Sequence, residues 1–414
     1  MLPVVTLVKH FNFYQVVLLL SWACFGRARM QVNLLSNNTT SSTTDLNVMD
    51  YGAVGNGKTD DTQAFSKAWA KACESCSPII LNVPSNNSFL LNHITFQGPC
   101  KPTSITVQIS GTILAPKEIS AWRSDDKEHW MIFDSINCLT LNGTGQINGQ
   151  GSSWWECREN NKCSEAPNAV AINKCNNTRI HNLTFVDSPM MHIALNDCVG
   201  ANISGITIIA PKDSPNTDGI HLEGSKQVRI TNSTIGTGDD CISIGTQTSN
   251  VNISHIFCGP GHGISVGSLG KNEESAVEEI YVSNCNFSNT MNGVRIKTWQ
   301  GGSGFAKSIR FEHIVINSTD NPIIIDQYYC NDGHNCPNKT SAVKLSDISF
   351  RDINGTSSKE TAINLACSET VACTGIHLEH VHLTSATKSK QAASRCKNAK
   401  GMWLDVIPTV KCLD

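Results

Sequence analysis

The chain is 414 residues long with a formal net charge of −3, and only 16% of its residues are charged, against roughly 25% in ordinary globular proteins. This balance, and the lack of any lysine- or arginine-rich run, exclude a general nucleic-acid-binding protein. Length alone favours two or three domains, although a repeat architecture can use this many residues in one.

The N-terminal segment, residues 1–29, is predicted to be a cleaved signal peptide. It has a basic start at Lys9, an apolar run centred on Val16–Leu20 and small residues up to Ala28. The run is too short to span a bilayer, and no later segment approaches about 18 uninterrupted apolar residues. We therefore expect a secreted protein of the extracellular space and cell wall, with no membrane contact after cleavage. Residues 30–46, rich in Asn, Ser and Thr, are expected to be a disordered lead-in to a single domain over 47–414.

Cysteine usage also favours an oxidising compartment. The sequence has 18 cysteines and 13 Asn-x-Ser/Thr sequons, of which we expect fewer than half to carry glycan because many lie within strand pattern. Connectivity does not follow from sequence, but nearest-neighbour spacing favours short disulfides that each pin one turn of the chain. The favoured pairs are Cys73–Cys100, Cys157–Cys163, Cys175–Cys198, Cys241–Cys258, Cys330–Cys336, Cys367–Cys373 and Cys396–Cys412, with Cys76, Cys138 and Cys285 unassigned.

One helix is predicted, from Thr62 to about Cys73, with the polar residues 59–61 before it as its cap. A helix at this place would cover the open end of a stack of strands, whose unpaired edges invite aggregation. Its apolar residues keep a period of 3.6 and are Ala64, Phe65, Ala68, Trp69 and Ala72.

From Pro78 onward, strands of three to six residues alternate with Gly, Asn and Asp turns, and one template recurs. A leucine-rich repeat would need a steadier period and leucine at nearly every anchor. Constant short strands with variable loops predict a parallel β-helix, in which inward residues stack into one core and the loops of one side form a groove. The anchors of the template are Ile180, Ile203, Ile230, Ile253, Val282, Phe311, Leu345 and Leu378.

Four polar clusters interrupt this pattern at 216–219, 238–241, 261–263 and 295–297. If each interval is one turn of the coil, the clusters lie above one another on one face. They would then form an acidic centre flanked by positive charge, which is a site for cutting an anionic substrate.

The four clusters, Asn-Thr-Asp-Gly, Gly-Asp-Asp-Cys, Gly-His-Gly and Arg-Ile-Lys, occur in this order within 82 residues. They resemble the signature motifs of the polygalacturonases, glycoside hydrolase family 28. The likeness extends to 48–53, 149–155, 188–192 and 322–330 and is greatest for plant members. The resemblance implies a right-handed, single-stranded parallel β-helix that hydrolyses α-1,4 bonds between galacturonates with inversion of configuration.

The chemistry itself calls for carboxyl groups. Inverting hydrolysis needs an acid for the leaving oxygen and a carboxylate to activate water, roughly 6.5–9.5 Å apart. Asp239 and Asp240 on one strand would point to opposite faces, so both reach one site only if the chain turns, which Gly238 permits. Crowded carboxylates raise at least one pKa, keeping one group protonated near mildly acidic pH. The resemblance implies that Asp239 is the general acid and that Asp218 and Asp240 hold the water.

His262 lies between two glycines, where it could hydrogen-bond Asp239 or the sugar and so tune the acid. A packed turn histidine is the alternative. The resemblance adds Asn216, from the first motif, as a substrate-binding residue.

Arg295 and Lys297 share one face of a predicted strand because Ile296 between them should point inward. Two cations directed at the groove suit the carboxylates of galacturonate, and a solvated charge pair is the alternative. The resemblance further implies a groove tyrosine at Tyr329, although neighbouring Tyr328 leaves the register open.

The expected partner is pectic polysaccharide, bound by a monomer with no metal or cofactor, and inhibitor proteins of the cell wall are further expected partners. Several other functions stay open. They are a calcium-dependent pectate lyase, a rhamnogalacturonan or xylogalacturonan hydrolase, and a β-helix that only binds pectin. We expect endo attack, with exo attack as the alternative.

Overall fold

The computed structural model describes residues 43–122, 128–163, 165–330 and 339–413. The expected signal peptide lies outside these residues. The lead-in was expected to run to residue 46, but this boundary is wrong, because Thr44–Asn47 form strand β1. Thr44 pairs with Ile79 of the next coil, so these backbone groups are hydrogen-bonded within the fold.

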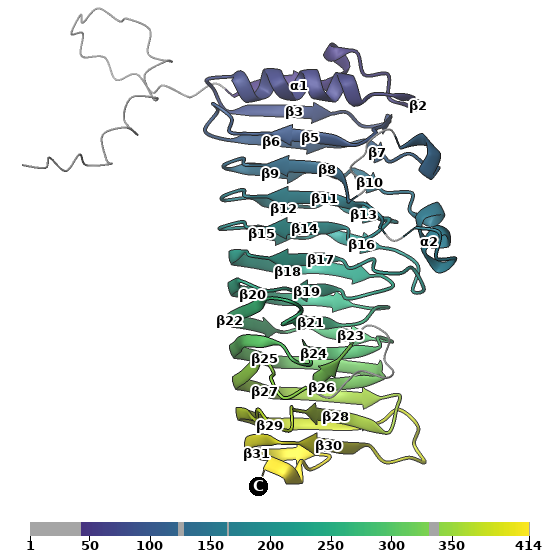
Figure 1. The fold of residues 1–414 in the computed structure, drawn as a ribbon. Helices are drawn as coiled ribbons and strands as arrows, with labels where there is room; N and C mark the ends of the chain where they lie inside the picture. Colours follow the sequence, from purple (N-terminus) through teal and green to yellow (C-terminus); the bar gives the residue numbers. More distant parts are fainter. Residues whose placement is uncertain (1–42, 123–127, 164, 331–338, 414) are drawn as a thin grey trace, which may run out of the picture. The chain divides into compact units, whose positions relative to one another are not determined.

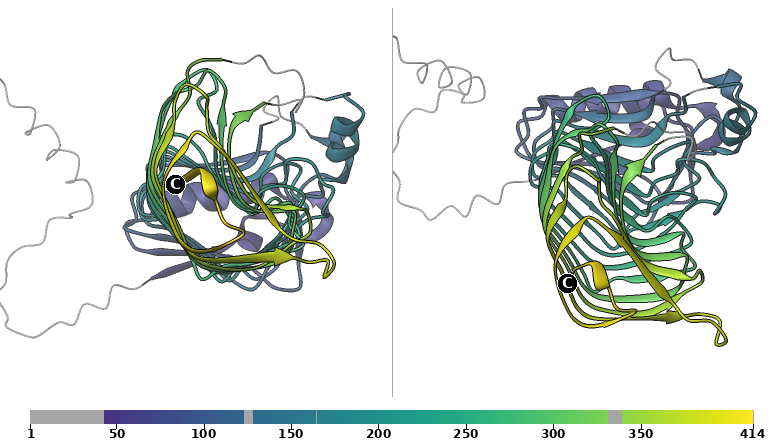
Figure 2. Two further views of the ribbon diagram at one scale, coloured as in Figure 1. Left: turned by 90° about the horizontal axis from the view of Figure 1, so that it is seen from below. Right: turned by 60° about the horizontal axis from the view of Figure 1, so that its bottom comes forward.

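The chain winds into a stack of coils, as Figure 1 shows and the end-on view in Figure 2 makes plain. Every strand pairing described is parallel, which confirms the predicted parallel β-helix. The first sheet, sheet A, contains β1 (Thr44–Asn47), β2 (Asn56–Asp60), β3 (Ile79–Val83), β4 (Ser88–Leu90), β6 (Ile105–Ile109), β7 (Thr112–Leu114), β9 (Leu139–Asn142), β10 (Gln146–Asn148), β12 (Arg179–His181), β13 (Thr184–Val186), β15 (Asn202–Ser204), β16 (Thr207–Ile209), β18 (Lys226–Gly236), β20 (Thr248–Cys258), β22 (Glu274–Ser283), β23 (Asn286–Ser288), β25 (Ser303–Thr319), β27 (Lys344–Ser357), β29 (Cys373–Ser385) and β31 (Ala399–Ile407). Sheet B contains β5 (Ile94–Gln97), β8 (His129–Asp134), β11 (Asn168–Asn173), β14 (Ile193–Asn196), β17 (Ile220–Glu223), β19 (Ile242–Ile244), β21 (Ile264–Leu269), β24 (Asn292–Trp299), β26 (Asn321–Tyr329), β28 (Thr361–Ala366) and β30 (Ala393–Lys397).

Helix α1 spans Thr62–Glu74 and buries all five apolar residues expected of it. It lies across the end of the stack next to β3 (Figure 1), and its rings pack edge-on against the first coils, with Phe65 5.4 Å from Phe89 and Trp69 5.2 Å from Phe96. A second helix, α2 (Ser152–Glu159), was not predicted. Short 3₁₀ turns occupy Val48–Tyr51, Ile119–Ala121 and Lys411–Leu413.

The first six predicted anchor residues are register partners in sheet A. Ile180 pairs with Ile203, and the column continues through Ile230, Ile253 and Val282 to Phe311. All six side chains are fully buried. Stacked identical or similar residues therefore form the core, as the repeat predicted.

The next anchor was assigned wrongly. Phe311 pairs with Phe350, which in turn pairs with Leu378, whereas Leu345 pairs with Ala306 in a different column. The error has a physical cause, because strand β27 has two non-glycine residues with positive φ, each an aspartate two residues after an apolar side chain. Asp347 (φ 55) follows Leu345 as Asp352 (φ 52) follows Phe350, so the two positions look alike in sequence.

Five of the expected disulfides are present, namely Cys73–Cys100, Cys157–Cys163, Cys241–Cys258, Cys367–Cys373 and Cys396–Cys412. Cys76 and Cys330 are disulfide-bonded as well, but Cys336, the expected partner of Cys330, lies outside the described residues.

The expected Cys175–Cys198 disulfide is wrong, because both residues are buried free thiols. Each sulfur is directed at the backbone of the preceding coil. Cys198 Sγ lies 3.2 Å from the carbonyl oxygen of Ile172, just as Ser225 Oγ lies 3.2 Å from that of Leu195 one coil later. Cys175, Cys198 and Ser225 thus occupy equivalent positions in successive coils, each with its side chain close to a carbonyl oxygen of the preceding coil. Burial raises the pKa of Cys175 to about 11 and that of Cys198 to about 12, so both remain thiols.

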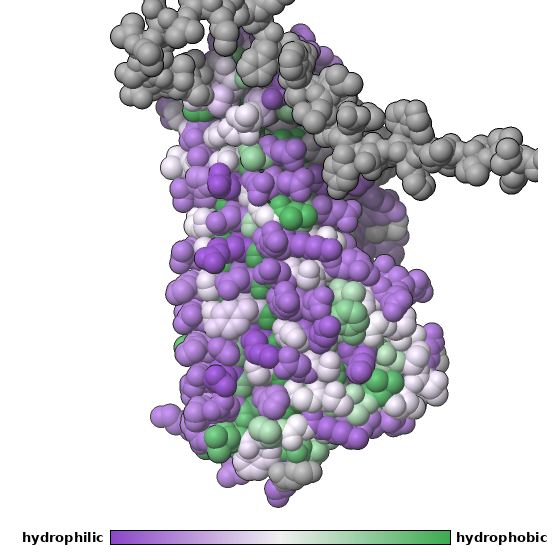
Figure 3. Space-filling model, turned by 90° about the vertical axis from the view of Figure 1, so that its left-hand side faces the viewer, coloured by the Kyte–Doolittle hydropathy of each residue, from purple (hydrophilic) through white to green (hydrophobic). Residues whose placement is uncertain are grey.

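The outer surface is mostly hydrophilic on the face shown in Figure 3, with scattered apolar residues. No helix among the described residues is long and apolar enough to cross a membrane.

Candidate active site

The four polar clusters do stack on the outer face of sheet B. Asp218, Asp240 and His262 each lie two residues before a strand, namely β17, β19 and β21. Because these strands are neighbours in one parallel sheet, the clusters come to the same edge in successive coils. The third strand is followed by β24, which carries Arg295 and Lys297.

Asp239 and Asp240 lie in a bend between β18 and β19, as their joint use requires. Gly238 is needed for close packing rather than for positive φ: a Cβ built there would lie 2.0 Å from the carbonyl oxygen of Ser214. The bend sends the Asp239 carboxylate toward solvent, where it is 18% exposed, and the Asp240 carboxylate inward, where it is 1% exposed.

The Asp239 carboxylate has three described hydrogen-bond contacts. Oδ1 accepts from the Asp240 backbone N–H at 2.8 Å and faces His262 Nδ1 at 3.0 Å, and Oδ2 accepts from Asn216 Nδ2 at 3.4 Å. Burial would raise the pKa of Asp239, but the hydrogen bond and charge of His262, with Lys297, lower it overall. In the free site Asp239 is therefore a carboxylate paired with His262.

Asp218 differs from Asp239 in its exposure and in the direction of its pKa shift. It is 6% exposed, and its Oδ2 accepts a hydrogen bond from Ser243 at 2.7 Å. Burial, with the charges of Asp239 and Asp240 beside it, raises its pKa well above the usual range. The expectation that crowding raises one carboxyl pKa thus holds for Asp218, whereas the sequence-based argument had placed the proton on Asp239.

Asp240 is the counter-ion of both cations. Its Oδ1 accepts from Arg295 Nη2 at 2.7 Å and from Ser265 Oγ at 2.7 Å, and its Oδ2 accepts from Lys297 Nζ at 2.9 Å. Ile296 points into the core, as predicted, so both cations lie on the outer face. They were expected to face the substrate freely, but they are held by Asp240 as well.

Asp218, Asp239, His262, Arg295 and Lys297 line a cavity of about 350 Å³ on the outer face of sheet B, whereas Asp240 is not among its lining residues. Most of the lining residues are polar, and two are methionines. Its lining residues are Met191, Asn216, Asp218, His221, Asp239, Ser243, His262, Gly267, Ser268, Met291, Arg295, Lys297 and Tyr329.

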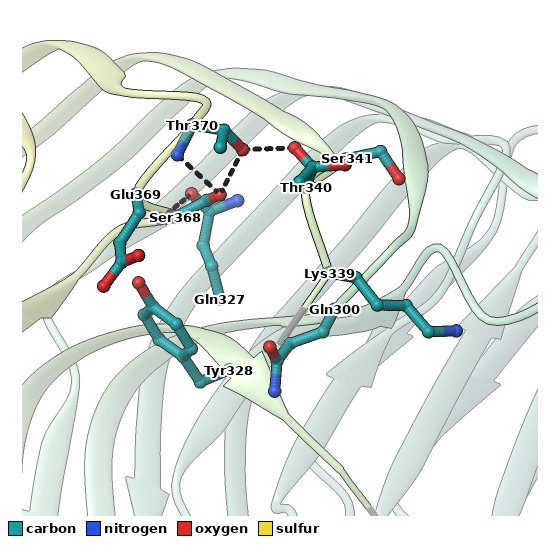
Figure 4. Close-up of a pocket in the computed structure, with 9 residues that line it drawn as sticks. All are labelled: Gln300, Gln327, Tyr328, Lys339, Thr340, Ser341, Ser368, Glu369 and Thr370. Atoms are coloured by element: carbon teal, nitrogen blue, oxygen red, sulfur yellow. Dashed lines mark hydrogen bonds between the residues drawn. The ribbon is translucent and has the colours of Figure 1, made fainter. Parts of the chain in front are cut away.

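Of the two adjacent tyrosines, Tyr329 lines this cavity and Tyr328 does not. Its ring lies 5.4 Å from Lys297 Nζ and packs edge-on against Trp299 at 5.3 Å. Tyr328 belongs to a separate pocket, shown in Figure 4, where its hydroxyl donates to the carbonyl oxygen of Cys367 and Lys397 lies over its ring.

A metal ion fits this site poorly. Asp239, Asp240 and His262 are the one group of three ligand-type side chains found among the described residues, with atoms within 4.8 Å of one another. However, His262 and Asp239 are already bonded to each other, and Arg295 and Lys297 occupy Asp240. A cation placed here would have to displace two existing cations.

Sequence reasoning missed three residues that contact the site: Ser243, Ser265 and Arg158. A signal for the two serines was present. Each stacked cluster residue is followed three positions later by an outward polar residue, so Asp218 leads to His221, Asp240 to Ser243, and His262 to Ser265. Arg158 had no comparable signal, since it lies on the unpredicted helix α2 and contacts Asn216, 58 residues away.

Comparison with known proteins adds three findings. The family model described as "Glycosyl hydrolases family 28" matches residues 73–409. A probable polygalacturonase of Arabidopsis thaliana is 46% identical over 361 residues, covering 86% of this chain and 81% of the relative. A polygalacturonase of Persea americana is 44% identical over 371 residues, covering 88% and 79%.

Among solved structures, an exopolygalacturonase from Thermotoga maritima superposes with a TM-score of 0.73 at 18% identity, covering 88% of this chain and 91% of the other. At this identity the likeness concerns the fold, and it shows that the stack is a right-handed parallel β-helix.

Proposed function

The chain belongs to glycosyl hydrolases family 28 and is a glycoside hydrolase, and from this premise we propose that it cleaves the α-1,4 bonds of polygalacturonate by inverting, endo-acting hydrolysis. One observation carries the proposal. Asp218 and Asp239 line one cavity with their pKa values shifted in opposite directions, beside two cations that are paired with the buried carboxylate of Asp240. We further propose that the enzyme acts as a secreted monomer in the cell wall, where inhibitor proteins could bind it.

Asp239 is the proposed general acid because it is the most exposed of the three carboxyl groups and can reach a leaving oxygen. Its lowered pKa does not prevent this role, because His262 and Asp239 can hold a proton between Nδ1 and Oδ1. When the leaving oxygen gains charge, this proton can pass through the carboxyl group to it. His262 is thus the proposed proton reserve of the acid.

Asp218 is the proposed base, with Asp240 helping to hold the water. A raised pKa makes Asp218, once ionised, the better proton acceptor near the working pH. Asp240 accepts two hydrogen bonds on Oδ1 and one on Oδ2, so one lone-pair position on Oδ2 remains for water.

Arg295, Lys297 and Tyr329 are the proposed binding residues for one galacturonate. Both cations retain further N–H donors after pairing with Asp240, and the tyrosine ring offers a flat face for a sugar. Asn216 is the proposed polar contact on the other side of Asp239.

The direct test is incubation of the purified protein with polygalacturonate, followed by reducing-end assay and chromatography of early products. We expect a ladder of oligogalacturonates. Monomer alone would indicate exo attack, and activity confined to rhamnogalacturonan or xylogalacturonan would assign one of those substrates. A product that absorbs in the ultraviolet and is lost with a calcium chelator would indicate a lyase, and binding without cleavage would indicate a pectin-binding β-helix.

A second prediction concerns stereochemistry. If water held by Asp218 and Asp240 attacks from below while Asp239 protonates from above, the α-linkage must yield the β-anomer first. Proton NMR within the first minutes, before mutarotation mixes the anomers, measures this. Initial α-galacturonate would mean a covalent sugar–enzyme intermediate, and the roles of Asp218 and Asp240 would then be wrong.

A further inference from the structure

Helix α2 projects from the stack and is tied to neighbouring segments near its start, where Trp155 Nε1 donates to the carbonyl oxygen of Ser188 at 3.1 Å and Ser153 Oγ donates to that of Lys117 at 2.6 Å. The Cys157–Cys163 disulfide joins its last part to the segment that follows it. The helix lies beside the coils near β13 and β16 (Figure 1). These anchors hold the last turn of the helix, and with it Arg158, in a defined place.

Arg158 reaches from this turn to Asn216, the first residue of the stacked clusters. Its Nη2 donates to Asn216 Oδ1 over a short hydrogen bond. A guanidinium can only donate, so the amide oxygen of Asn216 must face Arg158 and its Nδ2 must face Asp239. Nδ2 then donates to Asp239 Oδ2 at 3.4 Å, a long hydrogen bond of the kind that tightens when substrate binds.

Asp239 favours the same orientation, because a carboxylate only accepts, but its hydrogen bond to Nδ2 is long, so the short contact of Arg158 with Oδ1 is the stronger of the two that hold this amide. A rotation of the Asn216 amide by half a turn would bring an oxygen against the Asp239 carboxylate. The two oxygens would repel each other, and Asp239 would turn away from its position beside His262. The orientation of the Asn216 amide therefore determines whether the Asp239 carboxylate receives a hydrogen bond or is repelled.

Arg158 is an unfavourable residue for the fold itself. Its Nη1 is buried without a hydrogen-bond partner among the described residues, and burial lowers the pKa of its guanidinium. A buried donor without a partner costs stability. A purely structural role would not favour such a residue, whereas a role in the site would.

We propose that Arg158 is a positioning residue of the active site, acting through Asn216 to hold Asp239 in the geometry for proton transfer. The proposal rests on the proposed function, because it gives Arg158 a part in the same hydrolysis. It also explains why a helix outside the repeat pattern is pinned to the stack.

The test compares Arg158→Met with Arg158→Lys, because methionine keeps an unbranched apolar stem without donors and lysine restores a charged donor group. For Arg158→Met we expect kcat on polygalacturonate to fall on the order of 10- to 100-fold, as for a catalytic group misplaced by about 1 Å. KM should stay within about threefold, since Arg295 and Lys297 still bind the sugar. The Lys variant should recover part of kcat, and the thermal midpoint of neither variant should fall.

A double-mutant cycle distinguishes an effect of Arg158 that acts through Asn216 from a general effect of Arg158 on the fold. In an Asn216→Ala background, Arg158→Met should have little further effect on kcat, because its route to Asp239 is already absent. The wild type, the two single variants and the double variant should also be compared by thermal midpoint. Their midpoints should be non-additive, because Arg158 and Asn216 are hydrogen-bonded. Arg229→Met, an exposed arginine on β18, is the matched control and should leave kcat unchanged.

Wild-type kcat in Arg158→Met, or an equal loss with and without Asn216, would overturn the proposal. So would a loss of activity that follows a fall in thermal midpoint. These results differ from a failure of the proposed function, in which the wild-type protein itself would not cleave polygalacturonate.

Discussion

Asp239→Asn is expected to reduce kcat on polygalacturonate on the order of 10²-fold or more, the loss typical of a missing general acid. The amide has nearly the shape of the carboxyl group but cannot deliver a proton to the leaving oxygen. It also loses the proton shared with His262, which lies 3.0 Å away in the wild type. The measurement is reducing-end release at saturating substrate, with the thermal midpoint recorded on the same preparation.

The matched control for this experiment is Asp347→Asn, which makes the same chemical change at an exposed position on β27. It should retain wild-type kcat. A loss of less than about tenfold in Asp239→Asn would show that another group protonates the leaving oxygen. Asp218, with its raised pKa, would then be the first candidate.

Asp240→Ala is expected to be the most destabilising single change in the site. The Asp240 carboxylate is 1% exposed and neutralises Arg295 and Lys297, whose side chains are each 11% exposed. Removing it leaves two buried cations without a counter-charge, and breaking a buried pair in this way costs about 3–5 kcal/mol. Urea unfolding should show the loss as a shift of the midpoint at an unchanged slope.

The exposed pair between Arg310 and Asp347 gives the comparison. Arg310 Nη2 lies 2.8 and 2.9 Å from the two carboxylate oxygens of Asp347, but the side chains are 36% and 49% exposed. Asp347→Asn removes the charge and tolerates the positive φ of this position, so it should cost about 1 kcal/mol or less. If Asp240→Ala costs no more than Asp347→Asn, then Arg295 and Lys297 find solvent or other partners, and Asp240 is not what fixes them.

The fold could be predicted from sequence because its core is repetitive. Successive inward positions, such as Ile230 and Ile253, are both similar in sequence and partners in space. Prediction failed where two places in a coil looked alike, as at Leu345 and Phe350. It also failed where cysteine spacing implied a bond, because Cys175 and Cys198 are close but directed at different carbonyl oxygens.

The candidate site could be predicted as a set of residues, but its internal pairing could not. Stacked motifs bring Asp218 and Asp240 to one edge, and their order in sequence is enough to show this. Which carboxylate takes the cations depends on a bend of one residue at Asp239. Contacts such as that of Arg158 come from helix α2, which is outside the repeat, so no period relates its sequence to its position.

Three buried free thiols allow the unfolding of the stack to be followed. Cys175, Cys198 and Cys285 lie in different coils, and all three are buried in the native protein. An alkylating reagent can therefore modify each of them only after its own coil has opened. Since neighbouring coils stabilise each other in a solenoid, the order in which mass spectrometry finds these cysteines modified would show from which end the protein frays. The three buried thiols would therefore report, residue by residue, the order in which the coils unfold.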